Sequence, residues 1–430
     1  MKNLSNTFIL TCTFILLLLA PNAFGSTLKV CKTCRYTSVK QAVQKANPGD
    51  TILVSGGVYR ESGIDINKPL TLIGQNNAVI DGNFTGQLLT VTADNVTILG
   101  LTLKNVATSY TRDDAAIRVM GRQNIRIVGN TILKTYYGIY LQNSEKVLIK
   151  NNNILGDNTD RNESALGNAI HLYYTDEVEI SGNNVQGHRD GIYLEVVKNS
   201  QVHRNTSHKN LRYGLHFMFS DGNTYTYNTF RKNGAGVAVM YTRNVRMEHN
   251  TFEDNWGAAS YGLLLKEINN SVIHHNLFRR NTTAIHMESS SRLDIKHNDF
   301  ERNGWAIKLM TTCIEDTFRL NNFTGNSFDV STNGKSQYNY FENNYWEKYT
   351  GYDLNKDKVG DVPYRPVSLY AMLVEQVPPS VMLMRSFMVN LLDNMEKVLP
   401  SIIPEHLVDK FPLMKKIDHD NDRKLTQVLR

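Results

Sequence analysis

Two methionines and a histidine are the residues of this 430-residue chain whose types and spacing best suit chemistry. Met218 and Met240 lie 22 positions apart, and His216 lies two positions before Met218. Thioether sulfur and imidazole nitrogen together suit Cu(I), a soft cation. With Glu195, these residues form a candidate copper site that would hold the ion transiently. The alternative is that the methionines form an apolar patch for a partner protein.

A second candidate for metal binding is the pair Cys31 and Cys34, which are spaced as Cys-x-x-Cys. In an oxidising compartment, we expect a local disulfide between them, and a thiolate metal site is the alternative. The chain has four cysteines, of which Cys12 lies in a predicted leader. Cys313 is therefore left unpaired, and we expect it to pack inside the last repeats.

Oxygen-bearing side chains also alternate near the end of the repeats, as they do in a calcium loop. They are Asp353, Asn355, Asp357 and Asp361. Lys358 stands where such a loop needs a glycine, and Tyr364 stands where it needs a bidentate glutamate. Two interpretations stay open, a calcium site and an ordinary polar turn.

The elements that must position these residues are short repeats, each marked by an asparagine. The asparagines are Asn130, Asn152, Asn183, Asn205, Asn228, Asn250, Asn276, Asn298 and Asn321. Most steps between them are 22 or 23 residues, and a fixed period of this length indicates a solenoid. Apolar and polar residues alternate within each unit, which is typical of strands. We predict an all-β fold, a right-handed parallel β-helix with rungs of about 22 residues.

Each unit carries another strand before its asparagine, as in GIYL (138–141) and GLHF (214–217). The second and fourth residues of these strands are large and apolar, so they face inward, and the residues between them face outward. The first outward column is Tyr140, His171, Tyr193, His216, Ala238, Leu264, His286 and Lys308. The second is Gln142, Tyr173, Glu195, Met218, Met240, Lys266, Glu288 and Met310.

Neighbouring rungs of a parallel solenoid lie roughly 4.8 Å apart. This spacing predicts that Met218 and Met240 are side by side, whereas His171 and His286 are too distant from His216 to share an ion. The asparagines are predicted to be structural, since asparagine tolerates the left-handed backbone of a corner and its amide can bond along a stack. The remaining histidines are expected on the solvated surface near corners, namely His203, His249, His274, His275 and His297.

Many extracellular β-helices act on polysaccharides, but the outward carboxylates argue against an enzyme. Glu195 and Glu288 are four rungs apart, hence roughly 19 Å, which is too far for the paired carboxylates of a glycosidase. Asp190 is a lone acid at a rung boundary, and His188 and Arg189 lie at a corner without a partner acid.

The chain divides into five segments by pattern. They are a signal peptide (1–25), an N-terminal cap with a helix near 37–46 (26–50), the β-helix (51–346), a loop with the possible calcium site (347–366) and a helical C-terminal extension (367–430). Departures from the period predict loops at 109–114, 157–168 and 256–261. The apolar stretch 380–399 is interrupted by charged residues, so we do not expect it to cross a membrane. The formal net charge of +6 is spread without basic runs and does not suggest nucleic acid.

Several stretches resemble the NosD family of periplasmic proteins that mature nitrous oxide reductase. They are ANPGDTILVSGGVYRES (46–62), KPLTLIG (68–74), AVIDG (78–82), the NxF rungs, YDLNKDKVGDVPYRPVSLY (352–370) and, most specifically, the tail at 378–416. The resemblance implies a non-enzymatic partner of an ABC transporter, composed of an ATPase and a permease, that helps to deliver copper to the reductase.

The resemblance further implies a copper-chaperone lipoprotein as a partner, a C-terminal extension that docks on the permease, and a periplasmic location at the inner membrane. Two other functions stay open, a carbohydrate-active β-helix enzyme (a polysaccharide lyase or epimerase) and a docking adaptor that never binds copper. No motif of the family assigns Cys31 and Cys34, so the copper site rests on the geometry of His216, Met218 and Met240.

Overall fold

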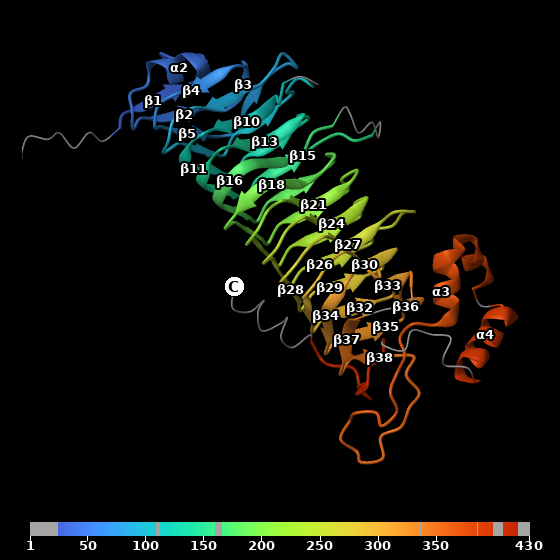
Figure 1. Cartoon of the computed structure of the whole chain (residues 1–430). Helices are drawn as coiled ribbons and strands as arrows, with labels where there is room; N and C mark the ends of the chain where they lie inside the picture. The colour runs from blue at the N-terminus through green and yellow to red at the C-terminus, as the bar shows by residue number, and fades with distance from the viewer. Residues whose placement is uncertain are drawn as a thin grey trace, which may run out of the picture.

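The chain forms a long parallel β-solenoid of about 13 turns, with helices beside its C-terminal end (Figure 1). The computed structural model describes residues 25–108, 112–159, 166–334, 338–384, 386–398 and 407–419. Except for Gly25, the predicted signal peptide lies outside these residues, as do parts of the predicted loops at 109–114 and 157–168. The predicted all-β fold is confirmed, and every strand pair within the solenoid is parallel.

A typical turn contributes three strands, and each strand pairs with its counterpart one turn away, so the strands form three files. File 1 is β4 (Ile64–Ile66), β7 (Leu89–Val91), β10 (Ala115–Met120), β13 (Tyr137–Gln142), β16 (Ile170–Ser181), β18 (Ile192–Lys198), β21 (Tyr213–Met218), β24 (Ala235–Met240), β27 (Tyr261–Lys266), β30 (Thr283–Glu288), β33 (Trp305–Leu309) and β36 (Phe328–Ser331). File 2 is β1 (Thr27–Val30), β2 (Thr51–Val54), β5 (Thr71–Gly74), β8 (Thr97–Leu99), β11 (Gln123–Val128), β14 (Glu145–Lys150), the second half of β16, β19 (Gln201–His203), β22 (Thr224–Thr226), β25 (Arg246–Glu248), β28 (Val272–His274), β31 (Asp294–Lys296), β34 (Ile314–Arg319) and β37 (Tyr338–Glu342).

File 3 forms a separate sheet of 13 strands. It is β3 (Gly57–Arg60), β6 (Ala78–Asp81), β9 (Thr102–Lys104), β12 (Thr131–Leu133), β15 (Asn153–Leu155), β17 (Asn184–Gln186), β20 (Thr206–His208), β23 (Thr229–Arg231), β26 (Thr251–Glu253), β29 (Leu277–Arg279), β32 (Asp299–Glu301), β35 (Asn322–Thr324) and β38 (Tyr345–Trp346).

The core is a set of apolar stacks that run along the solenoid axis. In file 1, the predicted inward residues Leu215 and Phe217 are fully buried. In file 3, phenylalanines form a continuous stack, with neighbouring ring centroids 4.1–5.6 Å apart from Phe230 to Trp346. Offset and parallel rings at this spacing bury large apolar areas and add favourable ring–ring contact.

The recurring asparagines form a continuous ladder at the corner between files 2 and 3. From Asn130 to Asn344, each amide nitrogen donates to the side-chain oxygen of the next asparagine at 2.9–3.1 Å. The same oxygen also accepts the backbone N–H of the preceding asparagine, as between Asn205 and Asn228. The predicted bonding along the stack is therefore confirmed.

The predicted left-handed backbone of these asparagines is wrong. The residue immediately before each asparagine has the positive φ angle, as His249 (55°) and His275 (54°) do before Asn250 and Asn276. The bend is made one position earlier, so that the asparagine side chain points inward to the next amide.

A second asparagine ladder lies at the corner between files 3 and 1. Its members are Asn210, Asn233, Asn255, Asn281, Asn303 and Asn326, joined through backbone N–H and amide donors. Each stands five positions after a member of the first ladder, so the signal was present in the sequence.

The N-terminal end of the solenoid is covered by α2 (Val39–Lys45), which buries Val39, Ala42 and Val43. Ser38 caps the helix by accepting the N–H of Gln41. The Glu61 carboxylate accepts the N–H groups of Val39 and Lys40, so a negative charge meets the positive end of the helix dipole. This cap covers the edge that the first turn would otherwise expose.

The C-terminal extension contains α3 (Leu369–Gln376), the 3-10 helix η2 (Pro378–Leu383) and α4 (Phe387–Val398). Tyr370, Ala371 and Val374 of α3 pack on Phe328 of β36. Lys308 on β33 forms an ion pair of 2.9 Å with Glu375. No helix among the described residues is long and apolar enough to span a membrane.

Residues 407–419 of the predicted helical extension are not helical and instead return to the solenoid. Asp409 closes the first asparagine ladder, since its Oδ2 accepts the Asn344 backbone N–H, the Asn344 amide and the indole N–H of Trp346 at 3.0–3.1 Å. Its Oδ1 accepts the N–H groups of Asn343 and Phe411. One buried carboxylate thus satisfies the donors that the last turn would leave unpaired.

Asp409→Ala is expected to lower the free energy of unfolding by at least about 3 kcal/mol, because several buried donors lose a charged acceptor. Denaturant unfolding measures the loss, and hydrogen exchange should show faster exchange in the turns near Asn321 and Asn344. Glu342→Ala, an exposed change on neighbouring β37, is the control. Equal stability of the two variants would contradict the capping role.

Candidate metal site

The register of file 1 places Glu195, Met218 and Met240 in one outward column, and His216 in the outward column beside it. Glu195 pairs with Met218, and Met218 pairs with Met240. Lys266 and Glu288 follow on the next two turns, with an ion pair of 3.6 Å between them. The predicted neighbourhood of the two methionines is confirmed, and so is the separation of Glu195 from Glu288 by four turns.

His216 was predicted to face outward, and its side chain is only 6% exposed. The rings of Tyr193 and Tyr213 lie against it with centroids 4.9 and 4.8 Å away. Its Nδ1 is 3.7 Å from Oδ2 of Asp190, which is beyond hydrogen-bond distance. Within the described residues, neither ring nitrogen has a hydrogen-bond partner. A buried imidazole with two unpartnered nitrogens is costly unless a ligand engages one of them.

Asp190 is the site residue that the sequence interpretation missed. Its Oδ1 accepts the N–H of Tyr213 at 3.2 Å, while its Oδ2 is buried without a hydrogen-bond partner in the described part of the chain. Its position directly before a GIYL strand was the available signal, because the next turn brings His216 alongside. A carboxylate in this position orients an imidazole and makes it a better metal ligand.

Tyr193 connects the two outward columns, because its ring contacts His216 and its hydroxyl contacts Glu195 and Met218. Its hydroxyl is 3.0 Å from Oε2 of Glu195 and 3.6 Å from Sδ of Met218. Burial, followed by the Glu195 charge, raises the pKa of Tyr193, so the phenol stays protonated and donates. Glu195, Met218 and Met240 are each partly exposed, whereas His216 is buried, so the candidate ligands span the boundary between the surface and the interior.

The other histidines of file 1 do not join this site. His171 stacks between Tyr140 and Tyr193, and burial lowers its pKa to about 3. Tyr193 thereby separates it from His216. His286 lies beside Tyr261 further along the file, and burial lowers its pKa as well.

The corner histidines, which were expected to be solvated surface residues, instead stack on one another or contact carboxylates. Tyr227, His249, His275 and His297 stack face to face, with centroids 4.7–4.9 Å apart. Buried His419 from the returning tail sits edge-on to His297 at 5.5 Å. Burial, with the neighbouring imidazoles, lowers the pKa of His275 to about 4. His203 and His274 instead contact the carboxylates of Glu179 and Asp294.

The two alternative metal sites are not favoured by the structure. Cys31 and Cys34 form a disulfide, and a disulfide lacks the thiolates that a metal needs. Cys313 is free and buried, as expected, and burial raises the pKa of its thiol to about 12.

The oxygens of the predicted calcium loop are engaged within the loop itself. Asp353 accepts the N–H groups of Asp357 and Lys358, Asp357 accepts that of Val359, and Asp361 accepts that of Leu354. Across the described ranges, no three histidine, cysteine, aspartate or glutamate side chains gather closely enough to hold a metal ion. This arrangement favours the polar turn.

Solved structures with the same fold have diverse activities. An α-1,3-glucanase of Streptomyces thermodiastaticus matches with a TM-score of 0.56 and 13% identity, over 73% of this chain and 66% of the glucanase. The surface adhesin PfbA of Streptococcus pneumoniae matches with a TM-score of 0.52 and 12% identity, over 71% of this chain and 85% of the adhesin. At these identities the matches show the β-solenoid alone.

Closer relatives by sequence are named "Probable ABC transporter binding protein NosD". The protein of Pseudomonas aeruginosa is 34% identical over 127 residues, which is 29% of either chain. The protein of Stutzerimonas stutzeri is 27% identical over 376 residues, 81% of this chain and 84% of the relative. Both relatives are named as binding proteins, which supports a solenoid binding protein rather than a carbohydrate-active enzyme.

The chain also matches the family described as "Periplasmic copper-binding protein (NosD)" over residues 43–163 and 157–352. It belongs to the NosD family. The resemblance expected from the sequence is thus confirmed across most of the solenoid.

Because His188 is buried at a corner, we predict that the free energy of unfolding decreases at acidic pH. His188 is fully buried, with Nδ1 3.0 Å from the carbonyl oxygen of Gln186, and burial lowers its pKa to about 4. A histidine of the unfolded chain titrates near 6.5, so between these values the unfolded chain binds more protons. The free energy of unfolding should fall by about 1.4 kcal/mol per pH unit as the pH drops through this range. His171 adds to the same slope.

Denaturant unfolding between pH 7 and pH 4 tests this slope. His188→Asn should flatten it, because the substitute does not titrate. Ser207→Ala, a buried polar change in the same region, should lower stability equally at each pH and leave the slope intact. Equal slopes for wild type and His188→Asn would show that His188 is not held neutral.

Proposed function

We propose that this protein accepts and passes on Cu(I) in the periplasm, as the partner of an ABC transporter and a copper-chaperone lipoprotein during maturation of nitrous oxide reductase. The observation that carries the proposal is His216, whose two buried nitrogens have no hydrogen-bond partner among the described residues and which lies next to the paired methionines Met218 and Met240. Family membership supports copper binding in general.

Copper is cargo in this proposal, and each of the candidate ligands has a different role in binding it. His216 is fixed between Tyr193 and Tyr213, and Asp190 lies at its Nδ1, so one imidazole nitrogen faces a defined direction. Met218 and Met240 are partly exposed, and the unbranched methionine side chain is adaptable, which suits a soft ligand that must release the ion to a partner. Glu195 lies one turn away and contributes negative charge near the cation.

The helical part of the C-terminal extension is proposed to dock on the permease. Met382 and Phe387 are 86% and 81% exposed, and Val381, Met384, Met388, Leu391 and Met395 extend the same apolar surface. Clustered exposed apolar side chains mark interaction sites, and methionine-rich helices adapt to a partner. Docking would keep the exported protein at the inner membrane.

A docking adaptor that never binds copper is the second candidate function. The exposed apolar surface of η2 and α4 favours it, since that surface serves docking whether or not His216 binds an ion.

Cu(I) binding by the exported protein separates the two functions. In an anaerobic competition assay, Met218→Leu/Met240→Leu is expected to weaken Cu(I) binding at least tenfold, because thioether ligands are lost while volume is kept. Met120→Leu, which alters an exposed methionine four turns earlier in the same column, is the control. Loss only in Cys31→Ser/Cys34→Ser would move the site to the N-terminal end. Absence of binding in the wild type would leave the adaptor.

Met382→Ser/Phe387→Ser is expected to abolish co-purification with the permease and ATPase from solubilised membranes, because both apolar anchors are lost. Cu(I) affinity should not change, since these residues lie outside the candidate site. Phe84→Ser removes an exposed aromatic at the opposite end and should leave co-purification intact. Undiminished co-purification of the double variant would contradict docking through this surface.

A further inference from the structure

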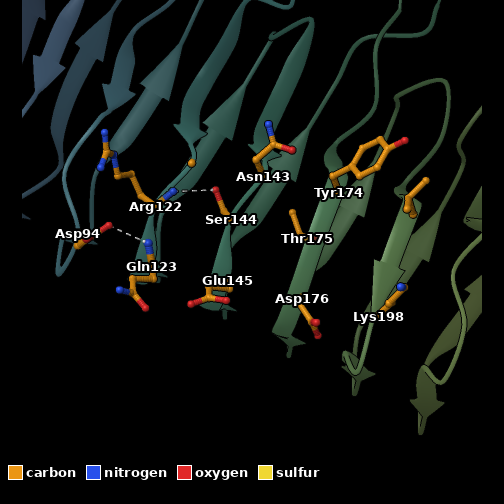
Figure 2. A pocket seen from close by; sticks show the side chains of 12 residues that line it. Asp94, Arg122, Gln123, Asn143, Ser144, Glu145, Tyr174, Thr175, Asp176 and Lys198 are labelled. Carbon is orange, nitrogen blue, oxygen red and sulfur yellow. Dashed lines mark hydrogen bonds between the residues drawn. The ribbon is translucent and has the colours of Figure 1, made fainter.

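A polar groove of about 570 Å³ runs along the corner between files 1 and 2 in the N-terminal half of the solenoid. Figure 2 shows its lining side chains rising from successive turns. Its floor is a register column in which Gln123 pairs with Glu145, Glu145 with Asp176, and Asp176 with Lys198. The groove therefore offers hydrogen-bonding side chains at the spacing of the turns, roughly 4.8 Å.

An aromatic ring borders this floor. Tyr174 is 52% exposed and lines the groove at the corner position, where Asn143 and Val196 occupy the neighbouring turns. Tyr173 holds it edge-on, with centroids 4.6 Å apart. The exposed ring is thus supported from behind and presents a flat apolar face beside polar groups.

Two polar groups of the groove lack partners in the described part of the chain. Thr175 is only 4% exposed, and its Oγ1 has no hydrogen-bond partner. Nε of Arg122 is also buried without one. Buried polar atoms are almost always satisfied, so each of these two atoms requires a partner that the described residues do not supply.

The charges of the groove exclude several ligand classes. Asp94, Glu145 and Asp176 stand against Arg122 and Lys198, and among the described residues no ion pair joins any two of these five. The mixture of signs does not suit nucleic acid or another polyanion, which needs clustered cations. The polar floor does not suit an acyl chain.

We propose that this groove binds a neutral oligosaccharide. Sugar hydroxyls both donate and accept, so one ligand class can satisfy carboxylates, amides, a guanidinium and a threonine hydroxyl together. The face of a pyranose ring is apolar and can lie on Tyr174. A glycan laid along the axis advances by about one turn spacing per sugar, which would present successive sugars to successive turns.

This inference is independent of copper handling, although the two sites are close. Glu195 of the candidate metal site directly precedes Val196 of the groove wall. A bound glycan would hold the solenoid along a polysaccharide of its compartment without engaging His216 or Met218.

Titration calorimetry on the exported protein tests the proposal with three neutral trisaccharides, tri-N-acetylglucosamine, maltotriose and cellotriose, and with trigalacturonate as an acidic comparison. At least one neutral trisaccharide is expected to bind with a Kd of about 1 mM or tighter. Tyr174→Ala and Asp176→Asn should each weaken it at least tenfold. Tyr340→Ala, which removes an exposed tyrosine near the opposite end, should have no effect.

Thermal unfolding of each variant separates lost binding from lost fold, and Thr175→Val provides a second, nearly isosteric test of the groove. The proposal is overturned if none of the neutral trisaccharides binds, if folded Tyr174→Ala and Asp176→Asn bind as the wild type does, or if trigalacturonate binds more tightly than the neutral sugars. Cu(I) affinity of these variants should equal that of the wild type.

Discussion

The buried asparagine ladder is the contact on which the rest of the molecule depends. Each side-chain oxygen accepts the backbone N–H and the amide N–H of the asparagine one turn earlier, at 2.9–3.1 Å. From Asn130 to Asn344, these bonds align one residue of each turn with its counterpart in the next. Insertions between two asparagines, such as Trp256–Tyr261, leave this alignment intact, because the chain returns to the ladder after each loop. Side chains on the outer face therefore stand in columns whose members are set by register rather than by loop length.

A ladder of this kind must be closed, because its last members would otherwise bury unpaired donors. Asp409 closes it from a segment that is 65 residues away in sequence, and the chain between them carries the helices. The extension is thereby fixed at both ends of its path, through α3 on Phe328 and through Asp409 on Asn344, while η2 and α4 keep an apolar surface exposed. The segment between Asn344 and Asp409 therefore both closes the core and carries the exposed apolar surface.

Burial on the outer face gives the candidate metal site its chemical character. The rings of Tyr140, Tyr193 and Tyr213 cover His171 and His216, so these two imidazoles are shielded from water although they point away from the core. Burial lowers the pKa of His171 to about 3, which shows how strongly this environment opposes a charged imidazole. At the corner between files 1 and 2, the groove beside Tyr174 carries charges of both signs, and among the described residues no ion pair joins Asp94, Glu145, Arg122, Asp176 and Lys198 to one another. One face of the solenoid therefore carries two chemically different surfaces within a few turns of each other.

The sequence by itself determined the solenoid, the inward residues and the pairing of Met218 with Met240. Strand pairing repeats the same register at every turn, so counting along the period is enough to align these residues. The second ladder, five residues after the first, was visible in the same way. Tertiary structure alone decided the contact of Asp190 with His216 and the burial of His171 and His216. It also decided the edge-on contact of His419 with His297 and the closure of the ladder by Asp409. These contacts depend on the backbone conformation at the corners and on the path of residues 407–419. Neither feature repeats along the sequence, so these contacts cannot be found by counting along the period.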